Sequence, residues 1–253
     1  MTAGDPQRAG RRLRAQAVHR LTPSDIGERV SIRHLVVTGA SSEPVASDVV
    51  GRLLGYEAGI LALVRRDGQL AFVDEAAIVA SRVVPAHPRL PAEPTDVGTA
   101  DHPLDRDAAR VLLVDDRDQV LLVAHQGTPD RIVWTAPGGG LQPGEDHHSA
   151  SVRELTEELG LDADVGPWVW SRTVTFRYAG VHLRQTERWF LARVSAYDEV
   201  TAPLDDAGLV AARWWSLAEL RRTDERLAPR ALPDHLEAIL RDGPPTSPVD
   251  VGR

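Results

Sequence analysis

Three glutamates in the sequence have a spacing that could bind a metal ion. Glu154, Glu157 and Glu158 stand at positions i, i+3 and i+4, so on a helix their side chains converge. Like charges at this spacing cost roughly a few tenths of a kcal/mol per pair, so helix stability alone does not favour them. A hard divalent cation such as Mg²⁺ prefers oxygen ligands and would reverse that cost. A solvated Glu/Arg helix surface is the alternative interpretation of the three acids taken alone.

The residues around these glutamates predict the helix that positions them. Asp146 can cap its start, residues 147–159 can form it, and Gly160 can end it. Arg153 can pair with Glu157 at i, i+4 and hold it in one rotamer. A glycine-rich run at residues 137–140 precedes the helix and lets the backbone approach closely. Apolar strands are expected before it, at residues 109–114, 119–124 and 131–136.

The order of these residues resembles a known motif. It reads Gly139, five residues, Glu145, seven residues, Arg153-Glu154-Leu155, one residue, Glu157-Glu158, one residue, Gly160-Leu161. This pattern is similar to the Nudix box at every fixed position. The resemblance covers roughly residues 105–242 and includes Trp214-Trp215-Ser216-Leu217 before a later helix. It implies an α/β/α sandwich with a mixed sheet, and an enzyme that hydrolyses a nucleoside diphosphate linked to another group.

The resemblance also implies roles for individual residues. The catalytic set is Glu154, Glu157 and Arg153, without fixing which glutamate is the general base. The implied metal ligands are Glu154, Glu157, Glu158, the backbone carbonyl of Gly138 and, as an additional candidate on the expected strand 182–194, Glu187. Gly139 and Glu145 would support the loop. The implied cofactor is Mg²⁺ or Mn²⁺, which lowers the pKa of a bound water while a carboxylate takes its proton.

The sequence determines the substrate less well than it determines the catalytic and metal-binding residues. Tyr178 lies 17 residues past the box, as in dinucleoside polyphosphate hydrolases, whereas residues 175–177 lack the proline typical of ADP-ribose hydrolases. Arg184 and Arg188 are candidate phosphate-binding residues. A nucleoside triphosphate or a dinucleoside polyphosphate is therefore the expected substrate. Two alternatives stay open: a Nudix-like ligand-sensing module without turnover, which usually loses box carboxylates, and an RNA pyrophosphohydrolase whose N-terminal part grips RNA.

Proline clustering between residues 85 and 104 predicts a linker between two separately folded units. Short strands expected at 29–37, 48–56, 60–66, 70–73 and 78–84 give residues 21–84 a resemblance to the SH3-like barrel of some actinobacterial proteins. The Nudix-type domain would occupy residues 105–242. Residues 1–20 are expected to be frayed and residues 243–253 to form a flexible tail.

Composition narrows the class of protein. With 42% hydrophobic and 26% charged residues, the chain can form ordinary hydrophobic cores. It has no cysteine, which excludes thiolate metal sites and thiol nucleophiles and fits the cytoplasm. Residues 1–98 carry a net charge of +1 and residues 99–253 carry −9, which argues against strong nucleic-acid binding. No apolar run is long enough to span a membrane. The expected partner is a small nucleotide; the oligomeric state stays open, a homodimer being one option.

Overall fold

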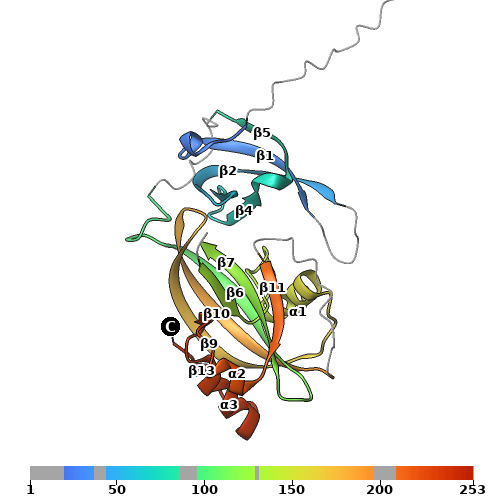
Figure 1. Ribbon diagram of the computed structural model, residues 1–253. Coiled ribbons are helices and arrows are strands. Elements are labelled where there is room, and N and C mark those ends of the chain that lie inside the picture. Colours follow the sequence, from blue (N-terminus) through green and yellow to red (C-terminus); the bar gives the residue numbers. More distant parts are fainter. Residues whose placement is uncertain (1–19, 37–43, 86–95, 129–130, 196–208, 253) are drawn as a thin grey trace, which may run out of the picture.

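The computed structural model describes residues 20–36, 44–85, 96–128, 131–195 and 209–252. Within these ranges the chain forms two sheets, an N-terminal one of five strands and a C-terminal one of eight (Figure 1). The helix with the three glutamates belongs to the C-terminal part. Residues 1–19 and half of the expected linker, residues 86–95, lie outside the described residues, so the expectations for these segments stay predictions.

The N-terminal sheet is antiparallel, with the strand order β4-β3-β2-β1-β5. Its strands are β1 (Arg29–Val36), β2 (Val45–Glu57), β3 (Ile60–Val64), β4 (Leu70–Asp74) and β5 (Ile78–Val83), and its short 3₁₀ turns are η1 (Pro23–Asp25) and η2 (Glu75–Ala77). Alternating apolar residues such as Val30, Ile32 and Leu53 point into its core. All five strands were expected from the sequence, and each lies within a few residues of its predicted range.

The C-terminal sheet is mixed. Its path runs β12-β8-β7-β6-β10-β9-β13, with β11 paired to β7, and β6 lies parallel to β10. The strands are β6 (Leu104–Val114), β7 (Val120–Thr128), β8 (Arg131–Thr135), β9 (Val165–Tyr178), β10 (Val181–Arg193), β11 (Leu209–Trp215), β12 (Leu227–Ala228) and β13 (Val249–Asp250). The helices are α1 (His147–Leu159), α2 (Leu217–Leu220) and α3 (Leu232–Asp242).

Helices cover both faces of this sheet, which gives the α/β/α arrangement expected from the sequence. Side chains alternate along β6, so Val111 and Leu113 pack against α1, whereas Leu112 and Val114 face the other way. The core on that second face includes buried residues of β9, β10 and α3, namely Trp170, Trp189, Leu232 and Leu236. Helix α1 is therefore fixed by its own apolar stripe, and its acidic side is left for other contacts.

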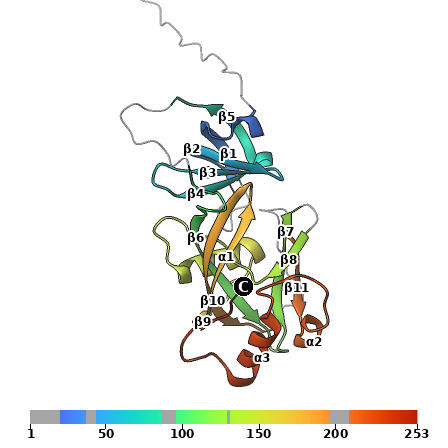
Figure 2. The same ribbon diagram turned by 90° about the vertical axis from the view of Figure 1, so that its left-hand side faces the viewer.

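The two sheets share a third hydrophobic cluster, which we call the interdomain cluster. Its buried members are Ala62, Leu104, Ala179, Val181 and Leu183, with Leu54, Ile60, Leu70, Phe72, Val97, Phe176 and Tyr178 packed around them. The β9–β10 hairpin reaches the N-terminal sheet in both views (Figures 1 and 2). The two sheets are thus packed on one another, and the expectation that each part folds separately stays a prediction.

Polar and backbone contacts reinforce this packing. The two carboxylate oxygens of Glu57 accept hydrogen bonds from Arg177 Nη1 at 2.6 Å and from the Gly180 N–H at 3.1 Å. A Cβ added to Gly55 would lie 2.1 Å from the carbonyl oxygen of Ala179, so the backbones of the two sheets touch. Only glycine allows this approach at position 55.

Two boundaries differ from expectation. Residues 96–104 were assigned to the linker, but β6 begins at Leu104, and the Gly98 carbonyl accepts a hydrogen bond from the His182 N–H. The expected flexible tail forms strand β13 up to Asp250, and Val251 is buried. Pairing with β9 orders this C-terminal segment despite its proline-rich composition. No helix in the described part of the chain is long and apolar enough to cross a membrane.

Candidate active site

Helix α1 begins and ends where its sequence predicts. The Asp146 side chain accepts a hydrogen bond from the Ser149 N–H at 2.8 Å and so caps the first turn. Gly160 ends the helix in the left-handed region, with φ of 63°. These two signals fix the register in which Glu154, Glu157 and Glu158 leave the helix.

The glycine run before the helix brings the backbone against the carboxylates. The Gly138 N–H donates a hydrogen bond to Glu158 Oε2 at 2.8 Å. A Cβ on Gly139 would lie 2.5 Å from Glu154 Oε1, so the carboxylate of Glu154 occupies the space above this glycine. Gly138 has a φ of 133° and lies directly against the β6 backbone. The glycines therefore make room for two of the three glutamates.

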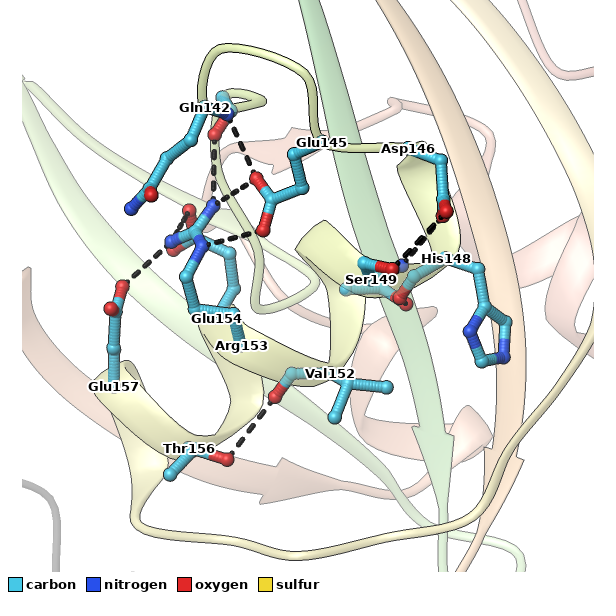
Figure 3. Close-up of polar contacts among 12 residues, drawn as sticks. Gln142, Glu145, Asp146, His148, Ser149, Val152, Arg153, Glu154, Thr156 and Glu157 are labelled. Atoms are coloured by element: carbon cyan, nitrogen blue, oxygen red, sulfur yellow. Dashed lines mark hydrogen bonds and ion pairs between the residues drawn. The ribbon is translucent and has the colours of Figure 1, made fainter. Parts of the chain in front are cut away.

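Arg153 ties the loop and the helix together (Figure 3). Its guanidinium lies 2.9 Å from Glu145 Oε1, 2.8 Å from Glu154 Oε1 and 2.7 Å from Glu157 Oε2. It also donates to the Gly140 carbonyl at 3.1 Å. Burial alone would lower the pKa of Arg153, but these carboxylates raise it, and Arg153 in turn lowers the pKa of Glu145. The expected Arg153–Glu157 pair is thus one contact of a larger network.

The glutamates carry more negative charge than their surroundings balance. Burial, together with the charge of Glu154, raises the pKa of Glu158 to about 7. Burial also raises the pKa of Glu154. In the described part of the chain, no three His, Asp or Glu side chains are arranged to hold a metal ion as they stand. Of the three glutamates, Glu154 and Glu157 contact Arg153, and Glu158 accepts a hydrogen bond from Gly138. The hard oxygen donors and the uncompensated charge nevertheless fit a divalent cation.

A second arginine network adjoins the loop from strand β6. Arg110 Nη1 donates to the carbonyls of Ala136 and Gly138. Its Nε lies 3.7 Å from Glu187 Oε1. The Gly138 carbonyl, expected to be a metal ligand, therefore has Arg110 as its partner here.

Glu187 has several further partners. It is 2% exposed and accepts hydrogen bonds from Gln185 Nε2 at 2.7 Å, Trp189 Nε1 at 3.0 Å and Arg172 Nη1 at 3.4 Å. Burial alone would raise the pKa of Glu187, but the two arginines lower it. A role as metal ligand stays a prediction, because this carboxylate accepts three hydrogen bonds and pairs with Arg110 in the structure.

With this geometry described, the chain can be compared with known proteins. The NUDIX domain model matches residues 104–236, more than half of the chain. The chain belongs to the Nudix family. An RNA pyrophosphohydrolase of Erythrobacter litoralis (strain HTCC2594) is 31% identical over 114 residues, which make up 40% of this chain and 70% of the relative. Diphosphoinositol polyphosphate phosphohydrolase 3-alpha of Mus musculus is 47% identical over 49 residues, 19% of this chain and 29% of that protein.

Solved structures of Nudix type resemble the C-terminal part. The E. coli ORF135 protein is 26% identical with a TM-score of 0.40, covering 56% of this chain and 95% of that one. The C. elegans Ap4A hydrolase binary complex is 20% identical with a TM-score of 0.42, covering 54% and 98%. On the family match and the curated relatives, the protein is a Nudix-type hydrolase. Nudix hydrolases generally use divalent metal ions.

Among the described residues, the contacts of the three substrate-binding candidates do not include the glutamates of the Nudix helix. Arg184 is exposed and pairs with Asp105 at 2.6 Å. Arg188 lies over the Trp168 ring, 4.4 Å from its centre. Both alternate along β10 with buried Gln185 and Glu187, so they occupy the opposite face of the strand from Glu187.

Tyr178 is half-buried in the interdomain cluster. Its ring packs edge-on against Phe72 of the N-terminal sheet, with 5.1 Å between ring centres. Near Arg184 the surface is hollowed by a cavity of about 380 Å³, lined by Asp105, Arg106, Asp107, Arg184 and Thr186. Roles for all three candidates in binding stay predictions.

Sequence reasoning missed the arginines of β6. Arg110 interrupts the apolar part of β6, Arg106 lies four residues before it between two aspartates, and the even spacing places both arginines on one face of the strand. That face also carries Leu112, which belongs to the core opposite α1. A charged residue facing a core needs a partner, and this signal was available in the sequence.

Proposed function

We propose that this Nudix hydrolase cleaves the diphosphate linkage of a nucleoside diphosphate derivative, by attack of water at phosphorus. The candidate substrates are nucleoside triphosphates and dinucleoside polyphosphates. The observation that carries the proposal is the group of three glutamates around a glycine loop, two of them largely buried and with raised pKa values. A site with this much uncompensated acid is suited to a divalent cation and, through it, to an anionic substrate.

Mg²⁺ or Mn²⁺ would be held by Glu154, Glu157 and Glu158, with the Gly138 carbonyl as a further ligand. When bound, the cation neutralises the diphosphate and lowers the pKa of a water molecule that it coordinates. Glu154 and Glu157 are the candidates to accept the proton of the attacking water. Arg153 positions both carboxylates through its planar fork of donors, and Glu145 holds Arg153 in place.

The relatives favour a second candidate substrate. The protein from Erythrobacter litoralis is named as an RNA pyrophosphohydrolase, and its match covers 70% of that protein. The 5′ end of a triphosphorylated RNA presents the same anhydride chemistry as a nucleoside triphosphate. RNA carrying a 5′-triphosphate therefore belongs in the substrate panel, as does a diphosphoinositol polyphosphate, after the mouse relative.

The N-terminal sheet is proposed to be an SH3-like barrel. Five short antiparallel strands in the order β4-β3-β2-β1-β5, with a 3₁₀ turn before the last strand, support this assignment. The absence of cysteine supports a cytoplasmic location.

A substrate panel tests the proposed activity. The full chain should release phosphate or a nucleoside monophosphate from at least one compound with Mg²⁺ or Mn²⁺, and from none in EDTA. Glu157→Gln should lower kcat at least about 100-fold, because it removes charge from the metal ligands. Glu225→Gln, an exposed glutamate outside the site, is the matched control and should keep wild-type kcat. A folded protein that cleaves nothing in the panel would refute the proposal.

A further inference from the structure

The side chain of Arg106 lies against the catalytic loop. A Cβ on Gly140 would lie 2.6 Å from Arg106 Nε and 2.7 Å from Nη2, so the guanidinium occupies the space above this glycine. The neighbouring Gly139 has the carboxylate of Glu154 in the corresponding place, 2.5 Å from an added Cβ. The guanidinium of Arg106 thus lies above Gly140, and a carboxylate of the proposed metal site lies above the adjacent Gly139. A ligand bound at Glu154 has Arg106 close by.

An aromatic side chain of the N-terminal sheet covers Arg106. Its guanidinium carbon lies 5.5 Å from the centre of the Phe72 ring, which is a cation–π distance. Phe72 in turn packs edge-on against Tyr178 at the end of β9, at an interplanar angle of 70°. Phe72 of one sheet therefore contacts Arg106 and is itself held by Tyr178 of the other sheet, and the interdomain cluster fixes both rings.

Arg106 also forms no ion-pair contact with a carboxylate among the described residues. Its one side-chain hydrogen bond to a described residue goes from Nη1 to Gln185 Oε1 at 3.2 Å. The other arginines nearby are paired, Arg110 and Arg172 with Glu187. Burial and the like charge of Arg110 lower the pKa of Arg106. A half-buried cation in this setting gains free energy when it binds an anion.

We propose that Arg106 binds a phosphate group of the substrate that lies beyond the cleaved diphosphate linkage, and that Phe72 of the N-terminal sheet positions Arg106. This rests on the proposed function in one respect, that the reacting diphosphate lies at Glu154. The ligand class is a chain of three or more phosphates, because the second binding point requires a phosphate beyond the cleaved linkage. The guanidinium fork suits a phosphate's paired oxygens.

Direct binding tests the Arg106 part without turnover. Inorganic tripolyphosphate is titrated into the metal-free full chain by calorimetry at low ionic strength. Arg106→Gln should weaken binding about tenfold or more, since it removes charge-assisted hydrogen bonds. Arg213→Gln is the matched control, because Arg213 also stacks on a ring, that of Trp215 at 3.8 Å, but lies on β11 and pairs with Glu219. Equal binding by wild type and Arg106→Gln, or no binding by wild type, overturns the proposal.

Kinetics test the positioning role of Phe72. With the best polyphosphate substrate of the panel, Phe72→Leu should raise KM about threefold or more while kcat stays within about twofold. Phe72→Tyr keeps the ring and should restore KM. The double variant with Arg106→Gln should be no worse than Arg106→Gln alone, because both changes act on one interaction. A loss of kcat with KM unchanged, or additive effects, overturns it. If the wild type cleaves nothing, the proposed function fails, and the tripolyphosphate titration still decides the role of Arg106.

Discussion

Replacing Glu158 by Gln separates the cost of burying this carboxylate from its proposed role in metal binding. The pKa of Glu158 is raised from 4.5 to about 7, first by burial and then by the charge of Glu154. Each pKa unit corresponds to about 1.36 kcal/mol between the protonation states. The ionised side chain therefore lowers the free energy of unfolding of the metal-free protein by about 3 kcal/mol. A glutamine carries no charge, and its Oε1 can still accept the Gly138 N–H.

The sign of this effect depends on pH. Below about pH 4.5, Glu158 is protonated in both folded and unfolded chains, so it costs nothing. As the pH rises to about 7, the unfolded state ionises first and stability falls; above that pH the full cost is present. Carboxylates that are not coupled to Glu158 titrate alike in wild type and variant, so the difference between the two proteins reports Glu158 together with its coupling to Glu154. At roughly 2–4 °C per kcal/mol, Glu158→Gln should melt about 6–12 °C above wild type at pH 8, and equal to it near pH 4.5.

The assay is thermal unfolding in EDTA from pH 4.5 to 8.5, followed by tryptophan fluorescence. Glu225→Gln, on an exposed glutamate, should show no pH-dependent difference from wild type. Adding Mg²⁺ should raise the Tm of wild type more than that of Glu158→Gln, because the cation compensates the charge that the variant lacks. A variant that is less stable than wild type at pH 8, or a difference that does not change with pH, would show that this carboxylate is not strained by burial.

Three further perturbations test the loop and the packing between sheets. Arg153→Lys keeps the charge but loses the planar fork, so kcat should fall at least about tenfold; unchanged kcat contradicts the positioning role. Gly55→Ala places a methyl 2.1 Å from the Ala179 carbonyl oxygen and should cost about 1–3 kcal/mol in thermal melts, whereas an unchanged Tm means that the sheets do not touch there. Removal of residues 1–96 exposes buried Val181 and should produce oligomers in size-exclusion chromatography; a monomeric, fully active fragment contradicts the shared cluster.

The sequence predicts the Nudix helix to the residue because its signals are local. A capping aspartate and a glycine with positive φ act within one turn of the helix that they delimit, and both are readable without tertiary information. The five strands of the N-terminal sheet, and β6, β7, β8 and β10 of the C-terminal sheet, are likewise predicted from their apolar residues. The roles of single carboxylates are harder. Glu187 has an ordinary strand position, and only the fold shows that it meets Arg110 and Arg172.

Packing between the sheets has no local signal. A proline-rich stretch indicates a change of element, but it does not say whether the units on either side touch. The contact depends on Gly55 in one sheet and on Ala179 and Gly180 at the hairpin of the other, more than 100 residues apart. Strand β13 has the same origin, since it exists because β9 offers a free edge. Composition did not indicate either contact, because the decisive partner is distant in sequence.

Charge is distributed around the loop in a way that suits both halves of a metal–polyphosphate complex. Residues 99–253 carry a net charge of −9, yet the strand beside the acidic loop places Arg106 and Arg110 within the fold. Arg110 is balanced by Glu187 and by backbone carbonyls, which leaves Arg106 as the cation without an acidic partner among the described residues. Acid alone would attract cations and repel substrate, and arginine alone would do the reverse. The Glu154 carboxylate above Gly139 and the Arg106 guanidinium above Gly140 together can bind both the cation and the polyphosphate. Phe72 connects Arg106 to the N-terminal sheet.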